Sequence, residues 1–284
     1  MTVDAAHLRQ WIGRTEEAAD TVNLWPFAAF AATLDEEREP VPGDPIPPGG
    51  HWLLFLPHAR QSTLGPDGHP RRGGFLPPVE LPRRMWAGGR LEFRAPVRIG
   101  DTVKRTSTIK DVTIKEGRSG TLAFVVVRHE VFAEGALAIA EEHDIVYREA
   151  PDPKIAPPAP PPAPDGAVWT RTVTPDPVLL FRYSALTFNG HRIHYDHPYA
   201  TGEEGYRGLV VHGPLIATLL MGLCRRSRPD AALSRFDFRA VSPLFDDRPF
   251  RLEGIPAADG RAAKVWARGP DGQLAMTADA AFGE

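Results

Sequence analysis

Several polar side chains that could take part in chemistry lie close together in the segment 188–197, which reads FNGHRIHYDH. Three of them are histidines at intervals of three. Imidazole exchanges protons near neutral pH and also binds metal ions, so this spacing could serve acid–base chemistry or a metal site. An ordinary polar loop is the third interpretation. The side chains in question are, in order, Asn189, His191, His194, Asp196 and His197.

The spacing does not favour a metal ion. Histidines at i, i+3 and i+6 would line one side of a helix, but Gly190 and Pro198 bracket the run, so a regular helix is not expected to continue through it. A His-x-x-His pair without a fixed third ligand is a weak metal pattern, and we expect no bound metal. A plain loop, in turn, does not explain why these residues stand just before GLVVHG (208–213).

A proton carrier followed by a glycine at a helix start suits chemistry next to a carbonyl group. His194 can take up and release a proton, because the pKa of an unperturbed histidine is about 6.5. Gly213 opens an expected helix, so its N–H is free and lies at the positive end of the helix dipole. Such an N–H can bind an oxygen that gains negative charge. Water addition to an α,β-unsaturated thioester needs this pair.

The elements that must hold these residues follow an α+β pattern. Asp176 can cap a helix that begins at Pro177. Leu215, Leu219 and Leu223 recur every four residues and predict one buried helix near 212–226. Alternating apolar residues predict antiparallel strands, which suggests a sheet wrapped around a helix. These alternating segments are 121–133, 136–148, 261–269 and 273–282.

The chain also repeats itself. LEFRAPVRIGD (91–101) matches FDFRAVSPLFD (236–246), and in the same order His51 corresponds to His212. Between the repeats, the stretch 151–164 reads PDPKIAPPAPPPAP and predicts a semi-rigid linker that cannot continue a sheet or helix. We therefore expect three parts: an N-terminal domain 1–150, a linker 151–166 and a C-terminal domain 167–284.

Composition excludes several classes of protein. The chain has 284 residues, a formal net charge of −3 and Cys224 as its only cysteine, so no intrachain disulfide can form and general nucleic-acid binding is not expected. The first residues, MTVDAAHLRQWIGRTEE, carry acids and no apolar core, so they do not predict a secretory signal. No apolar run is long enough for a membrane span. We expect a cytoplasmic protein.

NGHRIH (189–194) followed by GLVVHGPL (208–215) resembles the (R)-specific enoyl-thioester hydratases and dehydratases of the MaoC-like, hotdog-fold group. The resemblance implies a tandem double hotdog, in which two antiparallel sheets each wrap around a central helix. It implies His194, Asn189 and Gly213 as the catalytic residues. It also implies a hydro-lyase that needs no cofactor, since CoA is part of its acyl thioester substrate.

The first half carries a more specific resemblance. GHPRRGGFLPPVELPRRMWAGGRLEF (68–93) is similar to a narrower group, the mesaconyl-C4-CoA (3-methylfumaryl-CoA) hydratases and the mitochondrial type 2 3-hydroxyacyl-thioester dehydratases. IPPGGHWLLFLP (46–57) is similar to that group's first hotdog helix. The implied reaction adds water to a short branched dicarboxylyl enoyl-CoA such as mesaconyl-C4-CoA.

The chain departs from the usual hydratase motif, Asp-x-Asn-Pro-x-His, at its first position. Asn189 stands there, and an amide cannot take up a proton as a carboxylate does. His194 would then carry most of the acid–base work, with Asn189 holding the water. Asp196, or Asp35 at the matching place in the first half, could supply a carboxylate. The first half has no counterpart of His194, so we expect one active site.

Several residues are expected to bind the substrate. Arginine pairs well with phosphate and Trp can stack on adenine, so Arg84 and Trp86 are candidates for CoA, although a solvated loop with a buried Trp explains them equally well. Arg192 could pair with the free carboxylate of a dicarboxylyl thioester, with Arg94, Arg182 and Arg207 as rivals. The full expected set is His191, Arg192, Tyr195, His212, Arg84 and Trp86.

Other functions remain open from the sequence alone. The substrate could instead be a 3-hydroxyacyl-ACP or a fatty acyl-CoA. Because of Asn189, the protein could also be a non-catalytic subunit that binds acyl-CoA. No nucleic acid and no membrane is expected as a partner, and we expect a homodimer.

Overall fold

The structure is a computed structural model that describes residues 4–117, 120–150 and 159–283. The elements of the first half are α1 (Ala5–Arg9), β1 (Thr15–Thr21), α2 (Leu24–Thr33), β2 (Arg83–Phe93), β3 (Thr102–Gly117), β4 (Gly120–Ala133) and β5 (Ala136–Arg148). Those of the second half are β6 (Trp169–Val173), α3 (Pro177–Leu186), α4 (Gly213–Ser227), β7 (Leu233–Ala240), β8 (Phe250–Pro256), β9 (Ala262–Arg268) and β10 (Leu274–Phe282). None of the helices in the described ranges is long and apolar enough to cross a membrane.

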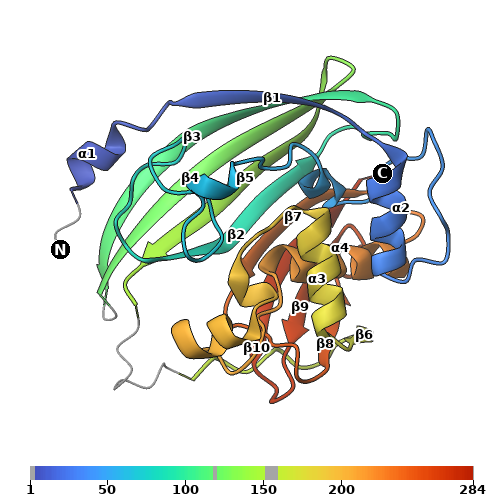
Figure 1. Ribbon diagram of the computed structural model, residues 1–284. Coiled ribbons are helices and arrows are strands. Elements are labelled where there is room, and N and C mark those ends of the chain that lie inside the picture. Colours follow the sequence, from blue (N-terminus) through green and yellow to red (C-terminus); the bar gives the residue numbers. More distant parts are fainter. Residues whose placement is uncertain (1–3, 118–119, 151–158, 284) are drawn as a thin grey trace.

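All ten described strands form one antiparallel sheet, in the order β1-β3-β4-β5-β2-β7-β10-β9-β8-β6. The five strands of the first half therefore lie on one side, and those of the second half on the other (Figure 1). The halves meet where β2 pairs with β7, and Leu91 lies opposite Phe236 in that register. These two residues are the first of the two matched repeats, so the repeats meet at their first residues and run in opposite directions from there. The expected boundary falls between β5 and β6.

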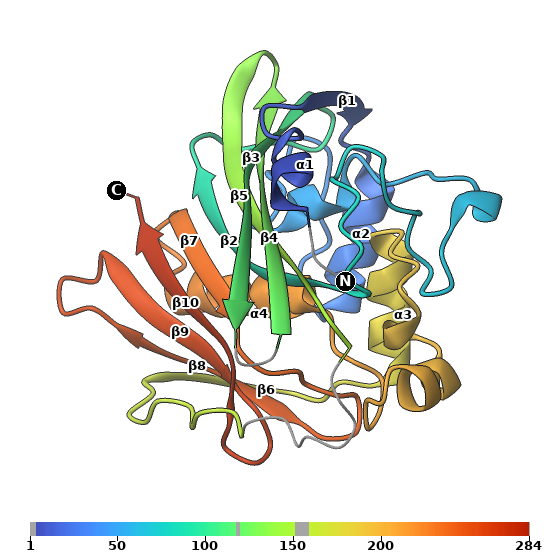
Figure 2. The same ribbon diagram turned by 90° about the vertical axis from the view of Figure 1, so that its left-hand side faces the viewer.

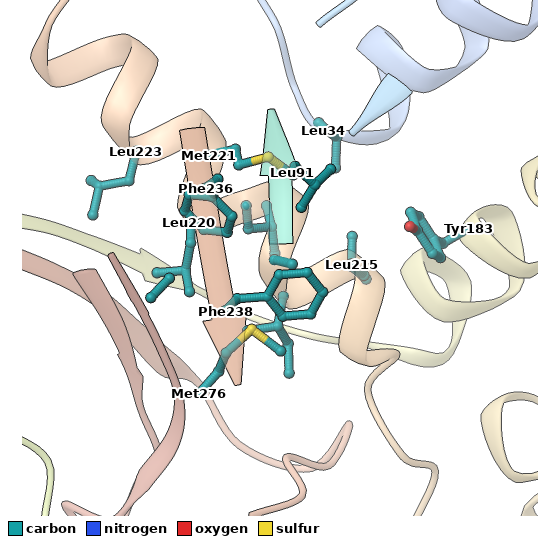
Figure 3. Packing of buried hydrophobic residues seen from close by; sticks show 14 of the residues in the cluster. Leu34, Leu91, Tyr183, Leu215, Leu220, Met221, Leu223, Phe236, Phe238 and Met276 are labelled. Atoms are coloured by element: carbon teal, nitrogen blue, oxygen red, sulfur yellow. The ribbon is translucent and has the colours of Figure 1, made fainter. Parts of the chain in front are cut away.

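The central helix of the second half is present as predicted. Pro214 occupies the first turn of α4, and Arg225 and Arg226 lie in its last turn. Leu215, Leu219 and Leu223 are buried, as the four-residue repeat indicates. Figure 3 shows α4 side chains packed with Phe236 and Phe238 of β7 and Met276 of β10. This packing fixes the N-terminus of α4 relative to the sheet.

The expected central helix of the first half is wrong. Within 46–57 only Gly50–Leu53 is helical, as a short 3₁₀ turn. Pro47 and Pro48 lack an N–H, and Gly49 has a left-handed backbone with φ of 82°. These residues stop a helix before it starts, because a regular helix needs both the N–H groups and right-handed dihedrals. Figure 2 shows α4 of the second half lying across the C-terminal strands, behind β10 in this view.

The second part of the proline-rich stretch joins the sheet, which differs from the prediction. Residues 151–158 lie outside the described residues. Beyond them, the carbonyl of Pro161 accepts a hydrogen bond from the N–H of Leu274 at 2.8 Å. The N–H of Ala163 donates to the carbonyl of Gly272 at 2.9 Å. Proline lacks a donor but keeps its carbonyl acceptor, so it can still pair along a sheet edge.

Gly88 and Gly89 lie inside β2 and not in a turn before it. They face β7 at the junction of the halves, where Gly88 pairs with Arg239 and Gly89 with Phe238. A Cβ on Gly88 would lie 2.5 Å from the carbonyl oxygen of Phe238. Glycine is therefore needed for the close approach of these two backbones.

We predict that Gly88→Ala destabilises the protein by about 1–3 kcal/mol, because the added methyl group pushes β2 away from β7. Gly222→Ala is the matched control. Gly222 lies inside α4 with open space around its Cα, so alanine there is expected to be neutral or to add about 0.5–1 kcal/mol. Urea unfolding of both variants measures the difference. Equal midpoints would contradict the strain at the junction.

Candidate active site

The polar segment after α3 is held by a tight local turn. Asp176 caps α3 by accepting from the N–H of Leu179 at 2.7 Å, as predicted. The helix ends at Leu186, and Phe188 turns the chain with φ of 48°. The side-chain oxygen of Asn189 then accepts from the N–H of His191 at 3.0 Å. Asn189 thus builds the turn with its oxygen, and the residue lines the cavity described below.

His194 is buried and held in one tautomer. Its Nδ1 lies 2.7 Å from the carbonyl oxygen of Val210. A carbonyl only accepts, so Nδ1 carries the proton and Nε2 keeps a free lone pair. Burial, more than any other cause, lowers the pKa of His194 to about 4. The ring is therefore a neutral base at physiological pH.

His212 and Gly213 stand beside this base at the start of α4. The ring of His212 stacks on that of His194 with centroids 3.7 Å apart, and its Nε2 lies 2.8 Å from Oγ of Ser184. Burial keeps the pKa of His212 well below its usual value. The N–H of Gly213 has no hydrogen-bond partner within the described ranges, and a Cβ there would meet no atom within 4 Å. The helix N-terminus is thus open to a ligand oxygen, as the sequence predicted.

One large cavity of about 3200 Å³ reaches this group, and both halves of the chain line it. Of the predicted residues, all but His212 are among its lining. His212 lies behind His194 instead, fully buried, so it supports the base and does not contact the cavity. The predicted residues that do line it are Asn189, His191, Arg192, His194, Tyr195, Gly213, Arg84 and Trp86.

Arg192 is already paired within its own segment. Its guanidinium lies 2.8 Å from the carboxylate of Asp196, four residues on, and 2.9 Å from the carbonyl oxygen of Pro66. It also lies over the ring of Tyr199, 4.0 Å from the centroid. A cation with three partners is poorly suited to bind a substrate carboxylate, so the expectation for Arg192 is not supported by its contacts. Tyr195 is exposed and donates to the carbonyl of Gly190 at 2.9 Å.

Trp86 and Arg84 lie on β2, on the wall of the cavity. Trp86 packs at 3.9 Å from the ring of His143 and 5.1 Å from that of Trp52, so it forms part of an aromatic wall. Arg84 lies beside the hydroxyl of Tyr147. Within the described part of the chain, no carboxylate forms an ion pair with Arg84. The rivals Arg94 and Arg207 pair with Glu92 and Asp247, respectively.

The structure brings in two residues that sequence reasoning missed, Asp67 and His69. Nδ1 of His69 lies 3.0 Å from the carboxylate of Asp67, and the His69 ring lies 4.2 Å from that of His191. The two suggested carboxylates, Asp35 and Asp196, are not among the cavity-lining residues, whereas Asp67 is. The only signal in the sequence was PDGHP (66–70), a turn-like stretch with one acid and one histidine.

Asp67, His69 and His191 are also the residues that could hold a metal ion. One potential ligand atom of each lies within 4.8 Å of the other two, and this is the one such group among the described residues. Arg84 adds positive charge nearby, since it lowers the pKa of both His69 and His191. That charge opposes a cation at this place.

Comparison with known proteins now identifies the family. The family model for hydroxyacyl-thioester dehydratase type 2 matches residues 49–246. The chain belongs to this family. It is 51% identical to the mesaconyl-C(4)-CoA hydratase of Chloroflexus aurantiacus, over 99% of this chain and 100% of that protein. It is 30% identical to the mitochondrial hydroxyacyl-thioester dehydratase type 2 of Schizosaccharomyces pombe, over 73% of this chain and 77% of that protein. The predicted family and the hydro-lyase class are confirmed.

Solved structures confirm the fold. A MaoC-like dehydratase from Phytophthora capsici matches with a TM-score of 0.70, at 13% identity over 99% of this chain and 98% of that one. A protein from Mycobacterium tuberculosis described as a double hotdog matches with a TM-score of 0.58, at 15% identity over 95% and 96% of the chains. The predicted double hotdog is therefore right, apart from its missing first helix.

We predict that His194 stays neutral, with its proton on Nδ1, from pH 8 down to about pH 5. An exposed histidine would titrate near 6.5, whereas burial places the pKa of His194 near 4, so protonation starts only in more acidic solution. Nitrogen–proton NMR correlations of the ring measure both tautomer and charge, and His194→Gln assigns the signals. A midpoint near 6.5 would contradict the buried, carbonyl-bound geometry.

Proposed function

We propose that the protein is an enoyl-CoA hydratase, which also catalyses the reverse dehydration of 3-hydroxyacyl-CoA. The observation that carries this proposal is the neutral His194, whose Nδ1 is bound to Val210 and whose Nε2 is left as a base, beside the open N–H of Gly213. A base next to an oxyanion donor is the pair that hydration of an unsaturated thioester requires.

In the proposed mechanism, the N–H of Gly213 binds the thioester oxygen. His194 takes a proton from water through Nε2 while the water oxygen bonds to the β-carbon. The electron pair of the double bond moves toward the α-carbon and the thioester oxygen, which gives an enolate. His194 then gives its proton to the α-carbon, so hydrogen and hydroxyl have been added in total. The NH₂ group of Asn189 can hold the water oxygen.

A short branched dicarboxylyl thioester such as mesaconyl-C4-CoA is the proposed substrate. The 51% identical relative carries that name, and the identity extends over the whole chain. Arg84 supports the same proposal from the geometry. It lines the cavity, lies close enough to His191 to lower the pKa of that ring, and has no carboxylate partner among the described residues. We propose that Arg84 binds the free carboxylate of the substrate.

The rival functions make different demands on the site. A fatty acyl-CoA or 3-hydroxyacyl-ACP would leave Arg84 without a carboxylate to bind. A non-catalytic subunit that binds acyl-CoA would not need the tautomer of His194 to be fixed. We propose that the enzyme acts in the cytoplasm without a bound cofactor. The predicted homodimer is supported by α2 and α3, which expose the apolar side chains of Trp25 and Val178 at 74% and 63%.

We predict that His194→Ala lowers kcat for mesaconyl-C4-CoA by ~10²–10⁴-fold, the usual cost of losing an acid–base group. Loss of the enoyl-thioester absorbance measures the rate, with crotonyl-CoA tested in parallel. His197→Ala is the control, since His197 is an exposed histidine of the same segment that does not line the cavity. Binding of both thioesters without turnover by the wild type would favour the non-catalytic subunit.

We predict that Arg84→Gln lowers kcat/KM for mesaconyl-C4-CoA by ~10–100-fold and leaves crotonyl-CoA within about threefold. A charge-assisted hydrogen bond contributes about 1.5–3 kcal/mol, and crotonyl-CoA has no second carboxylate to lose it. Arg94→Gln serves as the control, because Arg94 pairs with Glu92 at 2.6 Å. An equal loss for both substrates would mean that Arg84 serves the CoA portion or the fold.

A further inference from the structure

The site contains an acid–histidine pair that the mechanism above does not use. Asp67 and His69 come from the loop between the first-half 3₁₀ turn and β2, about 120 residues before the catalytic segment. Their hydrogen bond, 3.0 Å from Nδ1 to the carboxylate, puts the His69 proton on Nδ1 because an ionised carboxylate only accepts. Nε2 of His69 is then a free acceptor, and His69 lines the same cavity as His194.

This loop is fastened directly to the catalytic segment. The N–H of Arg192 donates to the carbonyl of Asp67 at 2.9 Å, and the Arg192 guanidinium donates to the carbonyl of Pro66 at 2.9 Å. Gly68 has φ of 89°, and a Cβ on it would overlap the carbonyl oxygen of Gly190. Two backbones can lie this close only with glycine at the contact. The position of His69 is therefore fixed relative to His191 and His194.

His69 lies next to His191, which in turn lies next to His194. A ligand atom of His69 and one of His191 lie within 4.8 Å, a gap that one water molecule can bridge with two ordinary hydrogen bonds. The His191 ring lies 5.4 Å from that of His194. A positive charge on His69 lowers the pKa of both other rings, so the three share one electrostatic environment.

The usual motif places a carboxylate beside the histidine so that the two share the water, and Asn189 removes that second acceptor. We propose that His69 takes its place: Nε2 of His69 accepts the hydrogen that stays on the attacking water, while His194 takes the transferred proton. Asp67 is the positioning residue, which holds the His69 ring in the accepting tautomer. The first half thus supplies a catalytic residue to the site in the second half. This inference rests on the proposed hydratase function.

Bond changes are the same as in the mechanism above. One O–H bond of water breaks and its proton goes to His194, the oxygen bonds to the β-carbon, and the other O–H bond survives in the product hydroxyl. With both hydrogens held by acceptors, a lone pair of the water faces the β-carbon. The gain is orientation of the nucleophile, so its loss should appear in kcat and not in KM.

The test compares His69→Ala, His69→Gln and Asp67→Asn with wild type and His194→Ala, all with mesaconyl-C4-CoA and crotonyl-CoA. We expect His69→Ala to lower kcat by ~10²-fold for both thioesters with KM within about threefold. His69→Gln keeps an acceptor oxygen and should recover at least about tenfold, and imidazole added to His69→Ala should also restore turnover. Asp67→Asn should lower kcat by about tenfold at unchanged KM. His197→Ala is again the control, since His197 is exposed and does not line the cavity.

Three outcomes would overturn the inference. His69→Ala could keep its kcat. It could lose activity that neither glutamine nor imidazole restores, which would make His69 a structural residue only. Wild-type activity could be lost on treatment with EDTA and restored by Zn²⁺, which would make Asp67, His69 and His191 metal ligands. If wild type hydrates and only His194→Ala fails, the inference falls and the proposed function stands. If wild type hydrates neither thioester, the proposed function itself falls.

Discussion

The hydrogen bond from Nδ1 of His194 to the carbonyl of Val210 is the interaction on which the site depends. It fixes the tautomer and leaves the lone pair of Nε2 for the substrate side. The bond needs Val210 to stay in place, and the backbone holds it there. The N–H of Val210 donates to Ile193 at 3.0 Å, and the next N–H, of Val211, donates to Leu244 at 2.8 Å. Three segments distant in sequence are thereby joined around one imidazole.

Burial is the second constraint on this base. His194 and His212 stack face to face and are both nearly inaccessible to solvent. Two charged rings at 3.7 Å would repel strongly in such a place, so burial and stacking together keep the pair neutral. A neutral His194 ring has a free lone pair, so it can accept a hydrogen bond from water before it takes up a proton. In the proposed mechanism the Gly213 N–H makes the polar contact with the oxyanion, because the neutral histidines carry no positive charge.

Short sequence patterns correctly predicted the helices whose positions depend on neighbouring residues. Asp176 and Pro177 marked the start of α3, and the leucine repeat marked α4. The match of 91–101 to 236–246 predicted the duplication, although not that β2 and β7 pair with each other. The spacing of Arg192 and Asp196 also predicts an i,i+4 ion pair, which the structure contains. We expected Arg192 to bind the substrate carboxylate because it lies within the hydratase motif. Residues 46–57 are similar to a hotdog helix, and a helix was therefore predicted there. The Pro-Pro-Gly-Gly run at 47–50 within this segment prevents a long helix.

The contact of Asp67 and His69 with the catalytic segment could not be predicted in this way. It joins residues about 120 positions apart through a loop without periodicity, and no pattern within either segment refers to the other. Only the fold brings Gly68 against Gly190. The family resemblance located the motif and showed that Asn189 stands where the motif has a carboxylate, but the position of Asp67 and His69 beside the motif depends on the fold.

The two halves differ most at the matched histidines, and the difference explains why one site is expected. His212 meets a neutral hydroxyl, that of Ser184, whereas His51 meets the carboxylate of Glu141 at 3.0 Å. Burial raises the pKa of Glu141, but the hydrogen bond and charge of His51 outweigh it and hold the pKa near 2. The indole N–H of Trp52 donates to the same carboxylate. Partners within the first half thus occupy this histidine, and no long helix presents a free N–H beside it, since only Gly50–Leu53 is helical there. The first half forms a wall of the cavity, and its residues Asp67 and His69 lie beside the candidate site of the second half.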